Sequence, residues 1–248
     1  MTTAARRHAR TGNESRRAVY HGQMESSGSP GAEQQVAETP RRARRMASGD
    51  VIREAAAGLF LEKGYQGTSM DEIASAAQVS KQTIYTHFAS KEELFADLVL
   101  GNADRVEEFA GGLAPMIDEA TDLEAGLRRL ARRYIALVVR PDVLRLRRLV
   151  IGESARFPEL ARTYYERVPG RVLDTLAGMF ARLAAEGRLE VQDPALAAQH
   201  FAWLIVGEPV DRGMFYPAES LRGQGELEQM ADAAVKVFLA AYGPKGAD

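Results

Sequence analysis

Three helix-start signals follow one another within 25 residues of this chain. Ser69 precedes Glu72 by three positions and Ser90 precedes Glu93 in the same way, which is the spacing of a capping box. Between them, Ser80 is placed to cap a further helix. Helices so short cannot each bury an apolar face alone, so they must pack against one another. The segment therefore predicts a small bundle of short helices.

The helical pattern extends on both sides of this segment. Apolar residues from Ile52 to Phe60 recur at the three- and four-residue spacing of one helix face, and Gly64 suits a helix end. Longer apolar stripes follow beyond about residue 110, and no stretch alternates as a strand does. We therefore predict an all-α chain with a three-helix unit at residues 48–94 and a larger helical domain at 95–248.

Composition restricts the class of protein. The 248 residues include no cysteine, which excludes disulfides and a cysteine nucleophile. No apolar run approaches the ~18 residues of a membrane span, and the N-terminus lacks the apolar stretch of a signal peptide. We therefore expect a cytoplasmic protein with no membrane partner. With only four histidines and no HExxH, GxGxxG, P-loop or GxSxG motif, an enzyme is disfavoured, and we expect no catalytic residue, metal or cofactor.

Charge is distributed unevenly along the chain. The net charge of −2 argues against nucleic-acid binding over the whole surface, but residues 1–47 carry nine Arg against four Glu. This tail has too few large apolar side chains to fold, and we predict that it is disordered. It is either a solvated linker or an arm that lies along DNA phosphates or in the minor groove. Met24 and Met46 are candidates for an alternative translation start, which would shorten this tail.

The short helices have the dimensions of a helix-turn-helix. Its first helix spans Met70–Ala77, Gln78-Val79 forms the turn, and the recognition helix runs Lys81–Phe88. Such a unit inserts its second helix into the major groove, N-terminal residues first. Ile84 and Phe88 point inward in this arrangement, which leaves the opposite face of the recognition helix free.

Three side chains on that outer face have the chemistry of base recognition. Gln82 can pair with adenine through two hydrogen bonds, and Lys81 can donate to guanine or phosphate. Thr86 can form a hydrogen bond or touch a thymine methyl. The alternative is an ordinary solvated helix face.

Two sets of residues fall at the spacing of a known family. The first comprises Ala56, Leu59-Phe60, Gly64-Tyr65, Thr68–Ala74, Ala77, Val79-Ser80, Thr83–Tyr85, His87-Phe88 and Ser90–Leu94, and the second comprises Arg148, Glu153, Phe157–Leu160, Gly187–Leu189 and Asp193-Pro194. Through the first set, across about 45 residues, the chain resembles the TetR family; through the second it resembles, less closely, the C-terminal domain of AefR-like members. The resemblance implies a homodimeric, all-helical repressor that binds a palindromic operator in double-stranded DNA and is released when a small-molecule inducer enters the domain of residues 95–248.

Further DNA contacts follow from the resemblance and from helix ends. Tyr85 is expected to meet phosphate, while His87 either does the same or packs beneath the first helix. Lys91 and the Thr68-Ser69 pair lie at the starts of helices, where free N–H groups attract anions, although Ser69 is primarily a cap. The predicted DNA-contact set is Thr68, Ser69, Lys81, Gln82, Thr83, Tyr85, Thr86, His87 and Lys91.

The sequence gives fewer indications of which residues of the C-terminal domain bind a ligand. A stripe of aromatic residues and methionine can line a pocket or simply form the core. Arg148 and Glu153 either pair with each other or anchor an anionic ligand. The predicted pocket residues are Tyr134, Arg148, Met179, Phe180, Phe201 and Trp203.

The last two helices, at about 194–208 and 226–242, are the predicted dimer interface. They carry apolar faces with small residues such as Ala197, Ala198 and Ala234, which equally suit packing within one chain. In the dimer two recognition helices would lie ~34–36 Å apart, or a multiple of that, and ligand binding would disturb this spacing, with the fourth helix as the lever. The rival function is an interaction module or an activator without a ligand.

Overall fold

The computed structural model describes residues 48–101, 103–118, 122–217 and 222–244. Within these ranges every regular element is a helix, so the predicted all-α class is confirmed. The predicted disorder of residues 1–47, and their contact with DNA, lie outside the described residues. The first helix occupies residues 48–63. The others are α2 (Met70–Ala76), α3 (Lys81–His87), α4 (Lys91–Leu100), α5 (Ala103–Gly111), α6 (Leu113–Asp118), α7 (Leu123–Val138), α8 (Pro141–Gly152), α9 (Pro158–Tyr165), the π-helix η1 (Glu166–Gly170), α10 (Arg171–Ala185), α11 (Pro194–Phe215) and α12 (Gln224–Tyr242).

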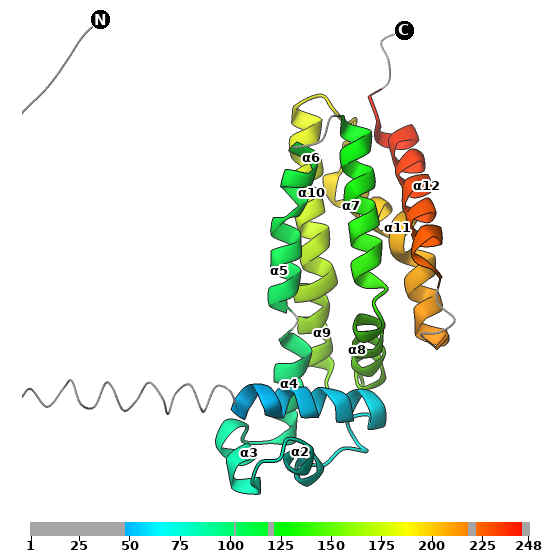
Figure 1. Ribbon diagram of the computed structural model, residues 1–248. Helices are drawn as coiled ribbons and strands as arrows, with labels where there is room; N and C mark the ends of the chain where they lie inside the picture. Colours follow the sequence, from blue (N-terminus) through cyan, green and yellow to red (C-terminus); the bar gives the residue numbers. More distant parts are fainter. Residues whose placement is uncertain (1–47, 102, 119–121, 218–221, 245–248) are drawn as a thin grey trace, which may run out of the picture. The chain divides into compact units, whose positions relative to one another are not determined.

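The N-terminal helices form the unit that the sequence predicts (Figure 1). The predicted capping box of α2 and the predicted serine cap of α3 are both present. The Ser69 side chain accepts from the Glu72 N–H, and the Ser80 side chain accepts from the Thr83 N–H. The turn between them depends on Gln78, which takes a positive φ of 53°. This conformation lets the Val79 N–H donate to the Ala74 carbonyl at 3.0 Å and brings the two helices together.

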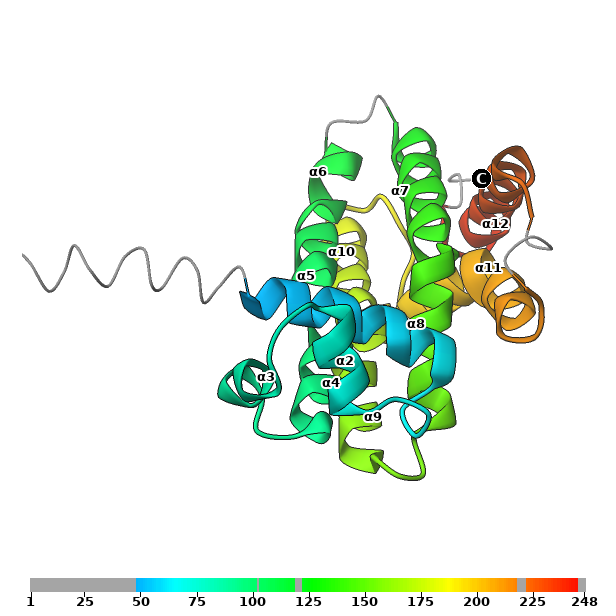
Figure 2. The ribbon, with the colours of Figure 1, turned by 60° about the horizontal axis from the view of Figure 1, so that its bottom comes forward.

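One hydrophobic cluster unites this unit with helices from the second half of the chain. Fully buried Ile52, Phe60 and Ile84 pack in the same cluster as Leu146 of α8 and Tyr164 of α9. The first helix runs across the ends of these later helices in both ribbon views (Figure 2). The predicted boundary near residue 94 therefore separates two sequence segments that share a core.

A second cluster fills the space between α7, α10, α11 and α12. At its centre Phe180, Phe201 and Phe238 lie with ring centroids 4.9–5.4 Å apart. All three side chains are fully buried. The long helices of the C-terminal domain are therefore held by aromatic packing as well as by aliphatic residues.

Two prolines behave differently from each other in the structure. Pro169 lies inside the π-turn η1, which joins α9 to α10. Pro209 is buried inside α11, which continues to Phe215 and not to about residue 208 as the sequence predicts. Further along the same helix, α11 approaches α8 so closely at Gly213 that a Cβ would lie 2.6 Å from Leu144 Cδ1.

Candidate nucleic-acid interface and ligand cavity

Helix α3 turns one face inward and one face outward. Ile84 is fully buried and Phe88 nearly so, which fixes the rotation of the helix. Lys81, Gln82 and Thr86 are consequently exposed, and the Tyr85 side chain is 45% exposed. The predicted outer face therefore exists, and DNA binding by its residues stays a prediction.

Polar contacts within this face are weak ones. Lys81 Nζ lies 2.8 Å from Asp71 Oδ1, with both side chains about two-thirds exposed at 64% and 65%, and this contact raises the pKa of Lys81. Such a solvated pair is worth little, so phosphate can replace the carboxylate. Thr86 Oγ1 donates to the Gln82 carbonyl at 2.8 Å, and the hydroxyl groups of Thr83 and Ser80 share a hydrogen bond. The Gln82 amide forms no hydrogen bond within the described ranges.

The Thr68 side chain is turned away from solvent, so its hydroxyl is not placed to contact DNA, and an anion contact at this helix start stays a prediction. Its side chain is 2% exposed, and its hydroxyl donates to the carbonyls of Gly64 at 2.9 Å and Leu59 at 3.2 Å. The hydroxyl therefore closes the end of the first helix. Ser69 next to it remains exposed, and its hydroxyl is engaged with Glu72 in the capping box.

Lys91 is held by the protein on its inner side. Its ammonium donates to the Tyr65 carbonyl at 2.9 Å and the Thr68 carbonyl at 2.8 Å, and it lies 4.2 Å from the centre of the Tyr65 ring. The Tyr65 hydroxyl in turn donates to Glu92 at 2.7 Å, which lowers the pKa of that carboxyl. Lys91 therefore fastens the loop before α2 to α4, a role that sequence alone did not reveal.

His87 lies beneath the first helix, as in the second of the two alternatives that the sequence left open. It is half-buried, and a Cβ on Gly49 of the first helix would lie 3.5 Å from its Nδ1. Its ring centroid lies 6.4 Å from that of Phe88. These contacts favour packing beneath the first helix over phosphate binding.

The burial of Thr68 yields a stability prediction. Thr68→Val keeps the shape of the side chain but removes the donor to two carbonyls, so the free energy of unfolding should fall by about 1–3 kcal/mol. Thr86→Val removes an exposed hydroxyl and should change that free energy by less than about 0.5 kcal/mol. Urea unfolding followed by circular dichroism measures both. A Thr68→Val protein that kept its stability but lost affinity for DNA would indicate that the Thr68 hydroxyl does contact DNA.

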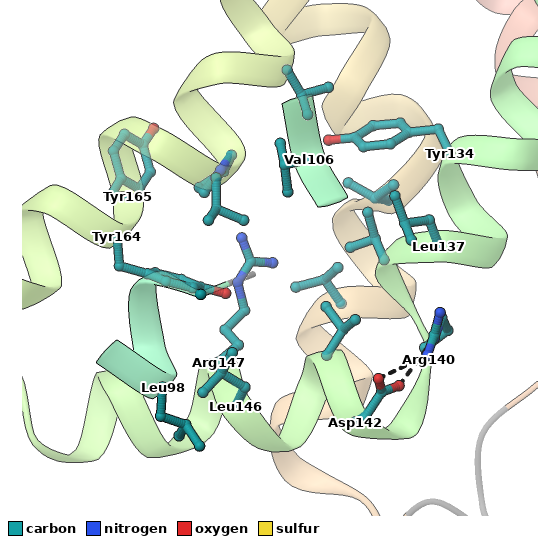
Figure 3. A pocket seen from close by; sticks show the side chains of 18 of the residues that line it. Leu98, Val106, Tyr134, Leu137, Arg140, Asp142, Leu146, Arg147, Tyr164 and Tyr165 are labelled. Atoms are coloured by element: carbon teal, nitrogen blue, oxygen red, sulfur yellow. Dashed lines mark hydrogen bonds and ion pairs between the residues drawn. The ribbon is translucent and has the colours of Figure 1, made fainter. Parts of the chain in front are cut away.

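A cavity of about 460 Å³ opens between the first helix, α4, α5 and the helices from α7 to α11 (Figure 3). This volume lies within the usual range for a small-molecule site. Of the predicted pocket residues, Tyr134 and Trp203 line it. Met179, Phe180 and Phe201 do not, because they are buried in the C-terminal core, so the core alternative holds for them.

Arg148 is also a wrong prediction as a pocket residue. Its Nη1 donates to the carbonyls of Gly213 at 2.7 Å and Tyr216 at 3.2 Å, which secures the C-terminal end of α11 against α8. Glu153 pairs with Arg156 at 3.5 Å, so the alternative in which Arg148 and Glu153 pair with each other does not hold. The arginine that lines the cavity is the preceding residue, Arg147.

Further cavity residues were missed from the sequence. Tyr164 of α9 and the Arg140–Asp142 pair of α8 line the cavity, together with Arg53 and Asp97 near the DNA-binding unit. Arg53 Nε lies 2.7 Å from Asp97 Oδ2. The signal available in sequence was the helical phase of α8: Leu146 and Val150 face the core, and Arg147 lies beside them.

No helix of the described ranges is long and apolar enough to cross a membrane. Those ranges also contain no cluster of His, Cys, Asp or Glu that could hold a metal ion.

Comparison with known proteins identifies both halves of the chain. Residues 52–98 match the family of bacterial regulatory proteins of the tetR type, and residues 125–244 match the C-terminal domain of AefR-like transcriptional repressors. A solved TetR-family transcriptional regulator from Mesorhizobium loti is 41% identical, with a TM-score of 0.74 over 81% of this chain and 98% of that one. The flavonoid-responsive regulator FrrA is 35% identical, with a TM-score of 0.65 over 81% and 99%.

Curated relatives match over a shorter stretch. IcaR of Staphylococcus epidermidis, a negative transcriptional regulator of a biofilm operon, is 41% identical over 38% of this chain and 56% of its own length. The transcriptional activator FasR of Mycolicibacterium smegmatis is 32% identical over 34% of this chain and 37% of its own length. The helix-turn-helix match, the C-terminal match and the likeness to solved regulators over 81% of the chain agree: the chain belongs to the TetR family of transcriptional regulators, with a C-terminal domain of the AefR-like type.

Proposed function

We propose that this protein is a dimeric repressor that binds a palindromic operator through paired α3 helices and releases it when a small organic molecule enters the cavity. The observation that carries the proposal is the position of the cavity. Arg53, Ala57 and Leu61 of the first helix line it, as do Asp97 and Leu98 of α4. A ligand there touches the elements on which the recognition helix is mounted.

The first helix and α4 offer a route from cavity to DNA. The Arg53–Asp97 ion pair joins these two helices at the cavity wall, and Arg53 also pairs with Asp50 at 2.8 Å. A ligand that fits only one arrangement of the two helices shifts the population toward that arrangement. The spacing of the two recognition helices then changes, and operator affinity falls.

Dimerisation is proposed through α11 and α12. Helix α11 exposes Leu196, Trp203 and Leu204, and α12 exposes Val237, each by 44–64%. Exposed apolar side chains gathered on neighbouring helices suit contact with a second copy. Ala197, Ala198 and Ala234 are buried within the chain, so these small residues serve the intramolecular alternative.

The relatives favour repression over activation. IcaR is a negative regulator, and the AefR-like domain belongs to repressors, whereas FasR is an activator that matches over a smaller part of its length. FrrA is flavonoid-responsive, and the present cavity is lined by three tyrosines and a tryptophan. An aromatic effector is therefore the first class to test.

Selection of bound DNA sequences tests the proposal directly. The full chain should enrich a palindrome whose half-sites lie about one helical turn apart or a multiple of that. A gel shift on this operator should then show release by at least one aromatic compound of a panel that includes the flavonoid naringenin and biphenyl-4-carboxylate. Repression is read separately from a promoter-reporter strain with the gene deleted. Enrichment of no shared sequence would contradict operator binding, and release by no aromatic compound would contradict the effector class.

A further inference from the structure

Arg147 stands out among the charged groups of the cavity. Six of these groups line it: Arg53, Arg140 and Arg147 are cationic, and Glu54, Asp97 and Asp142 are anionic. Arg53 pairs with Asp97 at 2.7 Å, and Arg140 pairs with Asp142 at 2.8 Å. Glu54 is exposed on the first helix and forms no ion pair with Arg147. In the described part of the chain, the half-buried Arg147 guanidinium has neither an ion-pair partner nor a hydrogen bond.

Two buried tyrosines frame this guanidinium. Tyr134 and Tyr164 are each 6% exposed, and neither hydroxyl makes a hydrogen bond to any described residue. Burial raises the pKa of Tyr134 to about 12 and raises that of Tyr164, while the charge of Arg147 acts to lower both. In Figure 3 the Arg147 side chain extends into the open space beside the Tyr164 ring, and the Tyr134 hydroxyl points into the same space from the other side.

The polar atoms of this arrangement are not sealed inside the protein: among the described residues, the sole fully buried side-chain polar atom without a partner is Nε of Arg128. The Arg147 guanidinium and the two hydroxyls therefore remain available to a ligand in the cavity that they line. A carboxylate satisfies an arginine through two parallel hydrogen bonds and can also accept from a tyrosine hydroxyl. The remaining wall is apolar, with Val106, Leu137 and Val172 among its residues. The cavity therefore offers one cationic end and a mainly apolar body.

We infer that the effector is an organic acid whose ionised carboxylate pairs with Arg147 beside Tyr134 and Tyr164, and whose apolar body fills the rest of the cavity. The inference rests on the proposed function, in which this cavity is the effector site. It adds the charge of the ligand and the residue that selects it.

The lone tryptophan provides the readout. Trp203 lines the cavity and is the only tryptophan in the chain, so its fluorescence reports occupancy. The probes are acids and their uncharged amides of nearly equal shape: biphenyl-4-carboxylate with biphenyl-4-carboxamide, cinnamate with cinnamamide, and decanoate with decanamide. The first two pairs carry aromatic bodies and the third carries an aliphatic one. Comparing them distinguishes an aromatic acid from a fatty acid as the effector.

At least one acid should bind about 10-fold to 100-fold more tightly than its amide, the range expected for a charge-assisted hydrogen bond. Arg147→Met should abolish this preference. Arg145→Met is the matched control, because Arg145 lies on the same helix, is exposed outside the cavity, and donates to the Pro141 carbonyl. It should keep the preference.

Thermal unfolding without ligand separates ligand binding from a structural role. Arg147→Met should melt no lower than the wild type, since the substitution removes a cation that has no partner. A lower midpoint together with an unchanged acid preference would overturn the inference, as would equal affinity for every acid and its amide, or no binding by any acid. Operator release by naringenin in those cases would leave the proposed function standing.

Discussion

Replacing Gln82 by alanine is expected to weaken binding to the selected operator by about 30-fold or more without loss of fold. Gln82 is exposed on α3, and its amide is free to pair with adenine. Such a two-bond contact contributes about 1–3 kcal/mol, and a dimer presents it twice, so about 2 kcal/mol is the lower limit. Fluorescence anisotropy at one fixed salt concentration measures the change, because salt alone alters affinity strongly.

The matched control for this variant is Gln192→Ala. Gln192 is exposed in the loop before α11, remote in sequence from the recognition helix, and its loss should leave operator affinity unchanged. Circular dichroism should show both variants folded. Equal operator affinity for Gln82→Ala and the wild type would show that Gln82 touches no base, and the recognition face would then have to be redrawn around Tyr85.

Phe201→Ala should lower the free energy of unfolding by about 3–5 kcal/mol, the cost of emptying a large, fully buried site. Its ring lies 5.4 Å from that of Phe180 and 4.9 Å from that of Phe238, so three helices lose contacts at once. Urea unfolding measures the effect at one protein concentration, since the stability of a dimer depends on concentration.

Phe215→Ala provides the same chemical change at the exposed end of the same helix. The Phe215 side chain is 79% exposed, and its loss should alter the free energy of unfolding by less than about 0.5 kcal/mol. A Phe201→Ala protein that kept its stability but no longer bound effector would return Phe201 to the list of ligand contacts.

The sequence predicted the DNA-binding unit well because its determinants are local. Capping serines, the Gln78 turn and the spacing of Ile84 and Phe88 act within a few residues, and the structure contains each of them. The orientation of the Thr68 side chain could not be predicted, because it depends on tertiary structure. Whether its hydroxyl faces solvent or closes the preceding helix is decided by how the chain folds back after Gly64.

The cavity could not be read in the same way. Its walls come from the first helix, from α4 and α5, and from the helices α7 to α11, so no single stripe of residues marks it. The chain places Arg145, Arg147 and Arg148 within four positions of α8, and only the packing of that helix assigns one to the solvent, one to the cavity and one to the end of α11. The same holds for Phe180, which periodicity cannot distinguish from a ligand contact.

The core shared between the N-terminal helices and α8 and α9 bears on how such regulators can be recombined. Leu146, Val150 and Tyr164 fill space beneath the recognition unit, so that unit lacks a finished interior of its own. Grafting residues 48–98 onto a foreign sensing domain would leave this interior facing unmatched side chains. A transferable unit from this chain should therefore include α8 and α9, so that the residues that complete its interior are transferred with it.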